Sequence, residues 1–199
     1  MSTKSIVGTQ TEKNLVDAYI GESLAYTRYT FYAAQAEKEG YYPISEIFKE
    51  TAANELRHAK VYFKFLEGGK VAPTGTPIDA GVIGDTASNL ATAAAEELSE
   101  GVDQYKNAAA VAREEGFVEI AEHFEAIAQI EMHHRERFML MLKQVKDGSV
   151  WKRDHAIKWK CLVCGYIFEG TEPPQTCPGC DHPYQHYMAM DIDELLGNA

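Results

Sequence analysis

The feature that most constrains the fold is an internal repeat whose two copies both end in Glu-x-x-His. Residues 39–58 align without a gap to residues 115–134, 76 positions further on. The matched pairs are Glu39/Glu115, Gly40/Gly116, Tyr41/Phe117, Ile44/Ile120, Glu46/Glu122, Phe48/Phe124, Ala52/Ala128, Glu55/Glu131 and His58/His134. Residues three apart on an α-helix lie about 60° from each other around the axis, so each copy presents a carboxylate and an imidazole on one face. The repeat predicts two helices that bind metal together.

Apolar residues recur at helical spacing through four stretches, which predicts helices over about 10–38, 43–67, 86–115 and 117–147. Residues 69–85 between the second and third helices are rich in Gly, Pro and Thr. An up-down-up-down bundle would need only a few residues there. The long connection therefore predicts that the second and third helices run parallel, as in an all-α ferritin-like bundle.

Each half of the repeat also offers an earlier glutamate. Glu22 precedes Glu55 by 33 residues and Glu97 precedes Glu131 by 34. Glu from each of two helices plus Glu-x-x-His from each of two others is the ligand inventory of ferritin-like di-iron proteins. Only the second half has a further carboxylate one turn later, Glu100, which would be a seventh ligand. Two tyrosines are placed to hydrogen-bond to the ligand carboxylates or simply to pack in the core: Tyr29 and Tyr105.

A Glu-x-x-His pair taken alone is more often a solvated helix face than a metal site. Two such pairs in register with Glu22 and Glu97 favour metal, because four carboxylates buried without cations would each cost several kcal/mol.

All four cysteines fall between residues 161 and 180, as Cys161-x-x-Cys164 and Cys177-x-x-Cys180. This spacing predicts one tetrahedral four-thiolate site, which zinc and iron both accept, so a structural zinc ribbon remains an alternative. Trp159, Tyr166 and Phe168 are expected to pack beside the metal. We expect two domains, a bundle over 1–150 and a cysteine domain over 151–199.

Composition excludes some functions. The 199 residues carry a formal charge of −11, which argues against a nucleic-acid partner. The sequence has no apolar run near the roughly 18 residues of a membrane span, and its first residues lack the apolar core of a signal peptide, so we expect no membrane partner and a cytoplasmic location.

With these motifs in this order, the chain resembles the rubrerythrin family over nearly its whole length. The helical part resembles a ferritin-like di-iron domain through Gly-Glu22-Ser, Glu55-Leu-Arg-His58, Glu97-Leu-Ser-Glu100 and Glu131-Met-His-His134. The C-terminal part resembles rubredoxin through Cys-x-x-Cys-Gly-Tyr and Cys-Pro-x-Cys, with Glu-Gly-Thr-Glu-Pro-Pro between them.

The resemblance implies a non-haem di-iron peroxidase that reduces hydrogen peroxide to water. It implies that Glu55 and Glu131 bridge two irons, that Glu22 and Glu97 are terminal ligands, and that His134 binds one iron. The other iron would be bound by Glu100 when oxidised and by His58 when reduced. The four cysteines would hold one redox-active iron. An external donor, such as rubredoxin or a reductase using NAD(P)H, would supply this iron with electrons.

Helix length adds an expectation about assembly. From His134 to Gly148 is 14 residues, or roughly 21 Å of helix, so the thiolate iron of the same chain starts far from the di-iron centre. We therefore expect a head-to-tail homodimer in which each cysteine domain serves its partner's bundle. Two alternatives stay open: a ferroxidase or iron-storage protein, and a non-catalytic zinc ribbon on a binding bundle.

Overall fold

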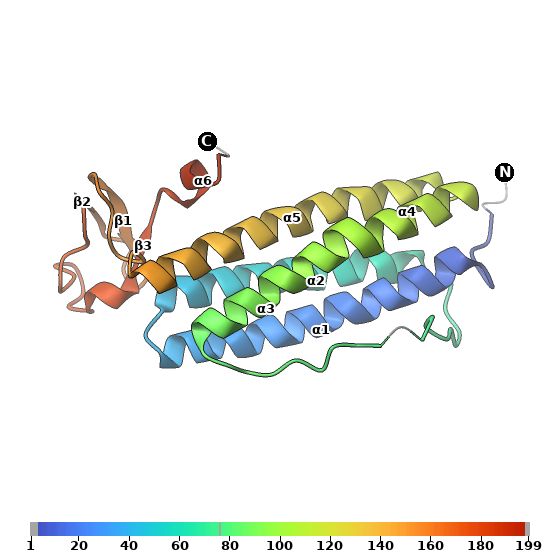
Figure 1. The fold of residues 1–199 in the computed structure, drawn as a ribbon, viewed down its shortest axis with the longest axis horizontal. Helices are drawn as coiled ribbons and strands as arrows, with labels where there is room; N and C mark the ends of the chain where they lie inside the picture. The colour runs from blue at the N-terminus through green and yellow to red at the C-terminus, as the bar shows by residue number, and fades with distance from the viewer. Residues whose placement is uncertain (1–3, 76, 198–199) are drawn as a thin grey trace.

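Four long helical stretches lie side by side in the computed structural model, which describes residues 4–75 and 77–197 (Figure 1). Three are single α-helices: α1 (Gln10–Lys38), α2 (Tyr42–Phe65) and α5 (Val118–Asp147). The remaining stretch consists of α3 (Thr86–Leu98), the π-helix η1 (Ser99–Gln104) and α4 (Tyr105–Glu114). Helix α1 packs along α2, and α3 and α4 pack along α5, so each copy of the repeat belongs to one helical hairpin.

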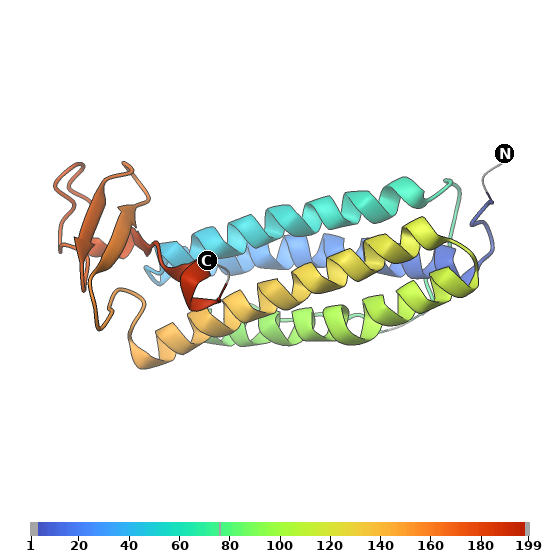
Figure 2. The same cartoon turned by 90° about the horizontal axis from the view of Figure 1, so that it is seen from above.

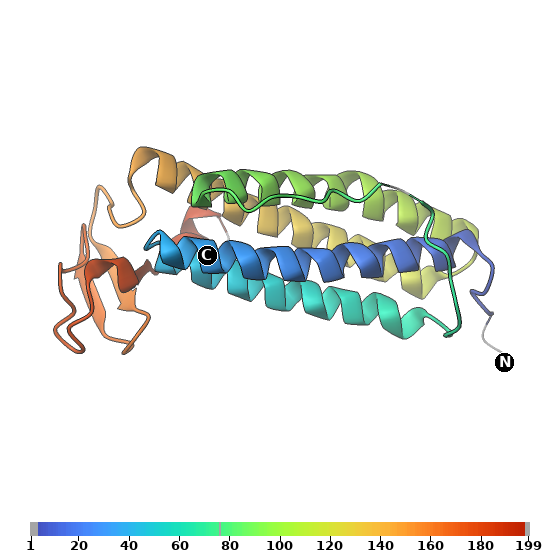
Figure 3. The ribbon, with the colours of Figure 1, turned by 90° about the horizontal axis from the view of Figure 1, so that it is seen from below.

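The connection between the hairpins runs back along the outside of the bundle from one end to the other (Figure 3). As a result, α2 and α3 start at the same end and run parallel (Figures 1 and 2). Side chains of α1 hold this connection in place, since Arg28 donates to the Asp79 carbonyl and the Tyr32 hydroxyl donates to the Val82 carbonyl. The bundle and the long crossover predicted from the sequence are both present.

The two hairpins cap each other through the repeated glutamates Glu39 and Glu115. Glu39 accepts a hydrogen bond from the Thr86 backbone N–H at the start of α3. Glu115 accepts hydrogen bonds from the Thr11 and Gln10 backbone N–H groups at the start of α1. The first N–H groups of a helix have no partner within it, and a carboxylate there also favours the helix dipole. The repeat thus encodes reciprocal contacts that join the halves.

Replacement of Glu115 by alanine should lower the free energy of unfolding by about 1–2 kcal/mol, as loss of a helix N-cap does. The measurement is chemical denaturation of the metal-loaded protein. Glu114→Ala is the matched control, because the neighbouring Glu114 side chain is exposed. Equal stabilities of the two variants would contradict the capping role of Glu115.

The third helical stretch is unbroken from Thr86 to Glu114, close to the predicted bounds, but it contains a π-helical segment that the sequence analysis did not predict. A π-helix holds one extra residue within a helical turn, and it spans Ser99–Gln104, with Glu100 inside it. Gly101 allows this segment to lie against α5, because a Cβ there would be 2.9 Å from the Ala128 carbonyl oxygen. An alanine at position 101 would therefore require the backbone to shift.

The extra residue of the π-helix is visible in the sequence as a change in the offset between the two copies of the repeat. The offset is 75 residues between Glu22 and Glu97 but 76 between Tyr29 and Tyr105. One residue is thus inserted between Glu97 and Tyr105, where the π-helix lies.

Two apolar clusters fill the bundle on either side of its middle. One contains Tyr29, Tyr32, Phe48 and Phe138 and lies toward the β-sheet. The other contains Leu15, Tyr62, Tyr105 and Phe124 and lies toward the opposite end. The predicted metal ligands lie between these clusters along each helix, so both ends of the site are closed by packed side chains.

The cysteine region forms a small antiparallel sheet at one end of the bundle (Figure 2). Its strand order is β2 (Ile167–Gly170), β1 (Ile157–Cys161), β3 (Tyr187–Ala189). Contacts with the bundle include ring stacking of Tyr41 on Trp151 and of Tyr42 on His186. A 3-10 turn, Tyr184–His186, precedes β3, and the short helix α6 (Ile192–Leu195) follows it. The domain boundary between residues 150 and 151 stays a prediction.

Candidate metal centres

Six of the predicted ligands come together in the middle of the bundle, and all are buried. Their exposed fractions are 0% for Glu22, 1% for Glu55, 7% for His58, 0% for Glu97, 0% for Glu131 and 1% for His134. They form two overlapping groups with ligand atoms within 4.8 Å of one another: Glu22, Glu55, His58 and Glu131, and Glu55, Glu97, Glu131 and His134. Glu55 and Glu131 belong to both groups.

The shared glutamates each direct one oxygen to each histidine. The two oxygens of Glu55 lie 3.0 Å from His58 Nδ1 and 3.0 Å from His134 Nδ1. Those of Glu131 lie 3.0 Å and 2.9 Å from the same two nitrogens. Such a carboxylate can bridge two ions. Glu22 and Glu97 each face one histidine only, His58 at 3.6 Å and His134 at 3.8 Å respectively.

Glu100 lies outside both ligand groups. Its side chain points toward α1, where a Cβ built on Gly21 would be 3.8 Å from Glu100 Oε1. Burial and the charges of Glu22 and Glu97 raise its pKa well above the ordinary value. The structure therefore places His58 at the site and keeps Glu100 beside it.

Tyr29 and Tyr105 each form a hydrogen bond with a glutamate of the opposite helical hairpin. The Tyr29 hydroxyl donates a 2.6 Å hydrogen bond to Glu97 Oε1, and the Tyr105 hydroxyl donates one of 2.6 Å to Glu22 Oε1. Each glutamate thus has one oxygen held by a tyrosine of the opposite hairpin. The other oxygen of each is left to face the site.

Several buried polar atoms of the site lack a hydrogen bond: Glu22 Oε2, Glu55 Oε1, Glu97 Oε2, both Glu131 oxygens and His134 Nδ1. Buried carboxylate oxygens without partners require a cation. Two divalent ions would supply the missing charge, and the mixture of carboxylate and imidazole donors suits iron and related metals. The residues present therefore fit a pair of metal ions.

Without metal, the histidines would have to supply the positive charge. Burial alone lowers the pKa of an imidazole, but the short contacts with the carboxylates of Glu131 and Glu55 outweigh it and raise the pKa of His58 and His134 to about 12. Burial, with the charges of Glu55 and Glu131, raises the pKa of Glu97 to about 8. Metal binding at Nδ1 must therefore release protons.

These shifts predict that the metal-free protein loses stability as the pH rises. The carboxyl of Glu97 has an ordinary pKa of 4.5 and a pKa of about 8 in the folded protein. The stability that this carboxyl gives the folded state is therefore lost as the pH rises from 4.5 to about 8. The two histidines have an ordinary pKa of 6.5 and a pKa of about 12 in the folded protein. The stability that they give the folded state therefore falls as the pH rises above 6.5.

The melting temperature of the metal-free protein should fall by on the order of 10 °C between about pH 5.5 and pH 9. Thermal unfolding followed by circular dichroism measures it. The metal-loaded protein is the control and should show a shallower slope, because its ligands are already deprotonated. Parallel slopes for the two forms would contradict the assignment of these groups to metal.

The four cysteine thiols form a second candidate site at the end of the bundle. All four sulfur atoms lie within 4.8 Å of one another, and none is in a disulfide. Two of the separations are 3.7 Å, Cys161 to Cys180 and Cys164 to Cys177. A tetrahedral ion with metal–sulfur bonds of about 2.3 Å separates its sulfurs by about 3.8 Å. The thiols therefore fit one tetrahedral metal ion.

Left-handed backbone follows each cysteine pair, as the turns around the thiols require. Gly165 has φ 78°, and Asp181, with φ 60°, is the single non-glycine residue of positive φ in the described part of the chain. Asp tolerates this conformation better than most residues.

The aromatic residues predicted to pack beside the thiols differ in how far they are buried. Trp159 is fully buried and Phe168 is partly buried in this domain's core, but 41% of Tyr166 is exposed. The sequence analysis missed Tyr187, which is fully buried against Cys161 and Cys177. Pairing of β3 with β1 places it there, and the signal that could have indicated it is the alternation Tyr187-Met188-Ala189.

Comparison with known proteins decides the family. Residues 13–142 and 88–161 match the family described as "Rubrerythrin", and residues 159–188 match the one described as "Rubrerythrin, rubredoxin-like domain". The chain belongs to the rubrerythrin family. The rubrerythrin of Nitratidesulfovibrio vulgaris is 45% identical over 190 residues, covering 96% of this chain and 99% of the relative. That of Porphyromonas gingivalis is 48% identical over 187 residues, covering 94% and 93% respectively.

Solved structures agree with this assignment. Nigerythrin in its fully reduced, all-ferrous state is 28% identical with a TM-score of 0.62, and the match covers 94% of each chain. A Mycobacterium tuberculosis bacterioferritin has a TM-score of 0.62 at 18% identity, covering 75% of this chain and 91% of that one, and shows the fold alone. The predicted family and the ferritin-like fold class are both confirmed.

Two further statements follow for this member of the family. Members of the family are generally oxidoreductases, and this chain has both a carboxylate–histidine group and a four-cysteine group that could hold metal. Over the described residues, no helix combines the length and the apolar character needed to cross a membrane.

Proposed function

We propose that this protein is a non-haem di-iron peroxidase that reduces hydrogen peroxide to water. The observation that carries the proposal is the geometry of Glu55 and Glu131, each of which directs its two oxygens to two different histidines. This arrangement suits two ions held close together. Two ions held there would supply the electrons and positive charge needed to reduce a substrate with two linked oxygen atoms.

The proposed ligand roles follow from the same geometry. Glu55 and Glu131 would bridge the irons, Glu22 and Glu97 would be terminal ligands, and His134 would hold one iron. His58 and Glu100 would alternate on the other iron, with Glu100 bound in the oxidised state and His58 in the reduced state. When bound, the iron pair would supply two electrons and stabilise the negative charge that develops as the O–O bond breaks.

The protein's own groups orient the site and restrict access to it. Tyr29 and Tyr105 each hold one oxygen of a terminal glutamate, which fixes the other oxygen toward the metal. The apolar clusters on both sides exclude bulk water. A dry site strengthens each electrostatic contact with the substrate.

The cysteine domain would hold a single redox-active iron that returns electrons to the bundle. Reduction of one peroxide to two waters consumes two electrons and two protons, so this one-electron centre would act twice in each turnover. An external donor, rubredoxin or a reductase using NAD(P)H, would supply it, and we propose a cytoplasmic location.

A homodimer would shorten the path between the centres. Four large apolar side chains are exposed on the α1–α2 face: Tyr19, Tyr26, Leu56 and Phe63. The Tyr19 and Phe63 rings pair at 5.5 Å. Because α1 and α2 are antiparallel, Tyr26, seven residues after Tyr19, lies level with Leu56, seven before Phe63. This apolar stripe suits a second copy of the chain placed head to tail.

Complementation between chains tests this arrangement. A chain lacking residues 156–199 and a full chain with Glu131→Gln should each be inactive alone. After mixing, activity should recover to roughly a quarter of the wild-type value, since half of randomly mixed dimers are mixed and each has one working pair. Adding Phe63→Glu to both chains should prevent recovery. Absence of recovery from the unmodified pair would contradict transfer between subunits.

The peroxidase proposal has a direct test. The iron-loaded protein is reduced without oxygen, titrated with hydrogen peroxide, and followed by the visible absorption of its ferric four-thiolate site. The colour should return, with two electrons withdrawn per peroxide. A colourless protein would indicate zinc in the cysteine site. Slow reaction with peroxide but rapid oxidation and storage of added ferrous iron would instead support a ferroxidase.

A further inference from the structure

The two histidines of the di-metal site differ on the side that faces away from the metal. Both direct Nδ1 at the carboxylates. The second ring nitrogen of His134, Nε2, lies 3.3 Å from the side-chain amide of Asn54 on α2. With Nδ1 on a metal, Nε2 carries the ring proton, and the amide can accept it through Oδ1 after rotation about its last bond. Asn54 thus fixes the plane of the His134 ring.

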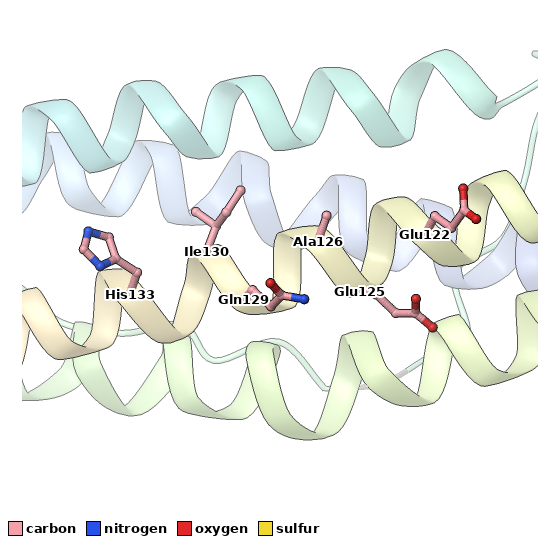
Figure 4. Close-up of a pocket in the computed structure, with 6 residues that line it drawn as sticks. All are labelled: Glu122, Glu125, Ala126, Gln129, Ile130 and His133. Atoms are coloured by element: carbon pink, nitrogen blue, oxygen red, sulfur yellow. The ribbon is translucent and has the colours of Figure 1, made fainter. Parts of the chain in front are cut away.

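The repeat identifies the residue of the second copy that corresponds to Asn54. Asn54 immediately precedes Glu55, and Ile130 immediately precedes Glu131. Figure 4 shows Ile130 pointing from α5 toward α2. An isoleucine side chain has no hydrogen-bonding group. Among the described residues, the polar contacts of His58 all involve Nδ1.

The surroundings of the two rings reinforce this difference. Next to His134, the buried Arg137 donates hydrogen bonds to Thr51 and Glu50 and joins α5 to α2. The repeat places Val61, Ile127 and Ala126 at the matching positions. On that side, Ala126, Ile130 and His133 line a surface pocket of about 580 Å³ (Figure 4). Helices α2 and α5 are therefore joined by side-chain hydrogen bonds beside His134, whereas the residues at the matching positions of the other copy are apolar.

From this we infer that the residue preceding each shared glutamate decides which histidine stays bound and which can leave. Asn54 is a positioning residue that holds His134 as a permanent ligand, and Ile130 leaves the His58 ring able to swing away when Glu100 replaces it. The inference rests on the proposed function, since it explains the asymmetry of the proposed exchange.

The test exchanges the two side chains in the iron-loaded full-length protein. Asn54→Leu removes the amide with little change in shape, and Ile130→Asn supplies one at the matching position of the second copy of the repeat. Asn54→Gln and Ile130→Leu are the conservative controls. Thermal unfolding of each variant verifies the fold. The readouts are the iron retained against a ferrous chelator and the ligands seen in crystals of the oxidised and dithionite-reduced proteins.

Asn54→Leu should weaken iron retention by about 10- to 100-fold, as loss of an outer hydrogen-bond partner does at other metal sites, and Asn54→Gln should restore it. Ile130→Asn should keep His58 bound in oxidised crystals, where the wild type and Ile130→Leu bind Glu100. Wild-type iron retention by Asn54→Leu, or continued exchange in Ile130→Asn, would overturn the inference. If wild-type crystals keep His58 bound in both states, the proposed exchange is wrong, and iron retention by Asn54→Leu still decides the role of Asn54.

Discussion

Glu131→Gln is expected to abolish binding of both metal ions and to reduce peroxide turnover by more than about 100-fold. Glu131 belongs to both ligand groups, and each of its oxygens lies within 3.0 Å of a different histidine. Glutamine has the same shape but offers one weakly coordinating oxygen. Because the change removes a shared ligand, loss of one ion without the other is not expected.

The same variant should have a smaller effect on the stability of the metal-free protein. The charge of Glu131 raises the pKa of Glu22, after burial and against the hydrogen bond from His58. Removal of Glu131 relieves Glu22 but also removes a carboxylate partner of His58 and His134, so the stability of the metal-free variant should change by less than that of the metal-loaded variant. Metal analysis and thermal unfolding measure the two effects. Glu136→Gln, an exposed position of the same helix, is the control.

An outcome in which Glu131→Gln retains two irons would remove the basis of the proposed site. Loss of metal together with a large loss of stability in the metal-free state would indicate a general packing role for Glu131 instead.

Cys161→Ser is expected to have the second largest effect, loss of turnover supported by the external donor while the di-metal site stays loaded. Cys161 is fully buried in the core of the small domain, with its sulfur 3.7 Å from that of Cys180. A domain this small depends on its metal for folding. The variant should lose the four-thiolate absorption and at least about 10-fold in donor-supported activity, since the proposed electron relay would no longer hold its metal.

The control for Cys161→Ser is a small-molecule reductant that reaches the bundle directly. With it, single-turnover oxidation of the di-metal site by peroxide should match that of the intact chain. Full donor-supported turnover by the variant would contradict the relay role. Loss of iron from the bundle as well would indicate that the two domains fold together.

Much of the site could be predicted because the ligands lie on regular helices. Helical periodicity fixes which side chains share a face, so Glu55 and His58 could be assigned to one face from their spacing alone. The repeat then identified Glu131 and His134, and the cysteine spacing identified the second site. The family assignment drew on the same residues and was confirmed.

Other features depend on contacts between helices that spacing does not record. The π-helix around Glu100 changes the offset between the two copies of the repeat by only one residue. A regular α-helix was assumed there, so this change was not recognised. The burial of Tyr187 follows from its pairing with Cys161, 26 positions earlier in the chain. The alternation Tyr187-Met188-Ala189 indicates a strand but does not give the strand it pairs with.

The sequence by itself determined the inventory: four helical stretches, a long crossover, two Glu-x-x-His faces and four paired cysteines. It could do so because each is a local pattern, set by backbone geometry within a few residues. Only the tertiary structure decided which atoms meet: each oxygen of Glu131 with a different histidine, each tyrosine with the opposite hairpin's glutamate, and Asn54 with His134. Those pairings depend on how the helices are rotated and shifted against one another, and that is fixed by the packing of the whole interior.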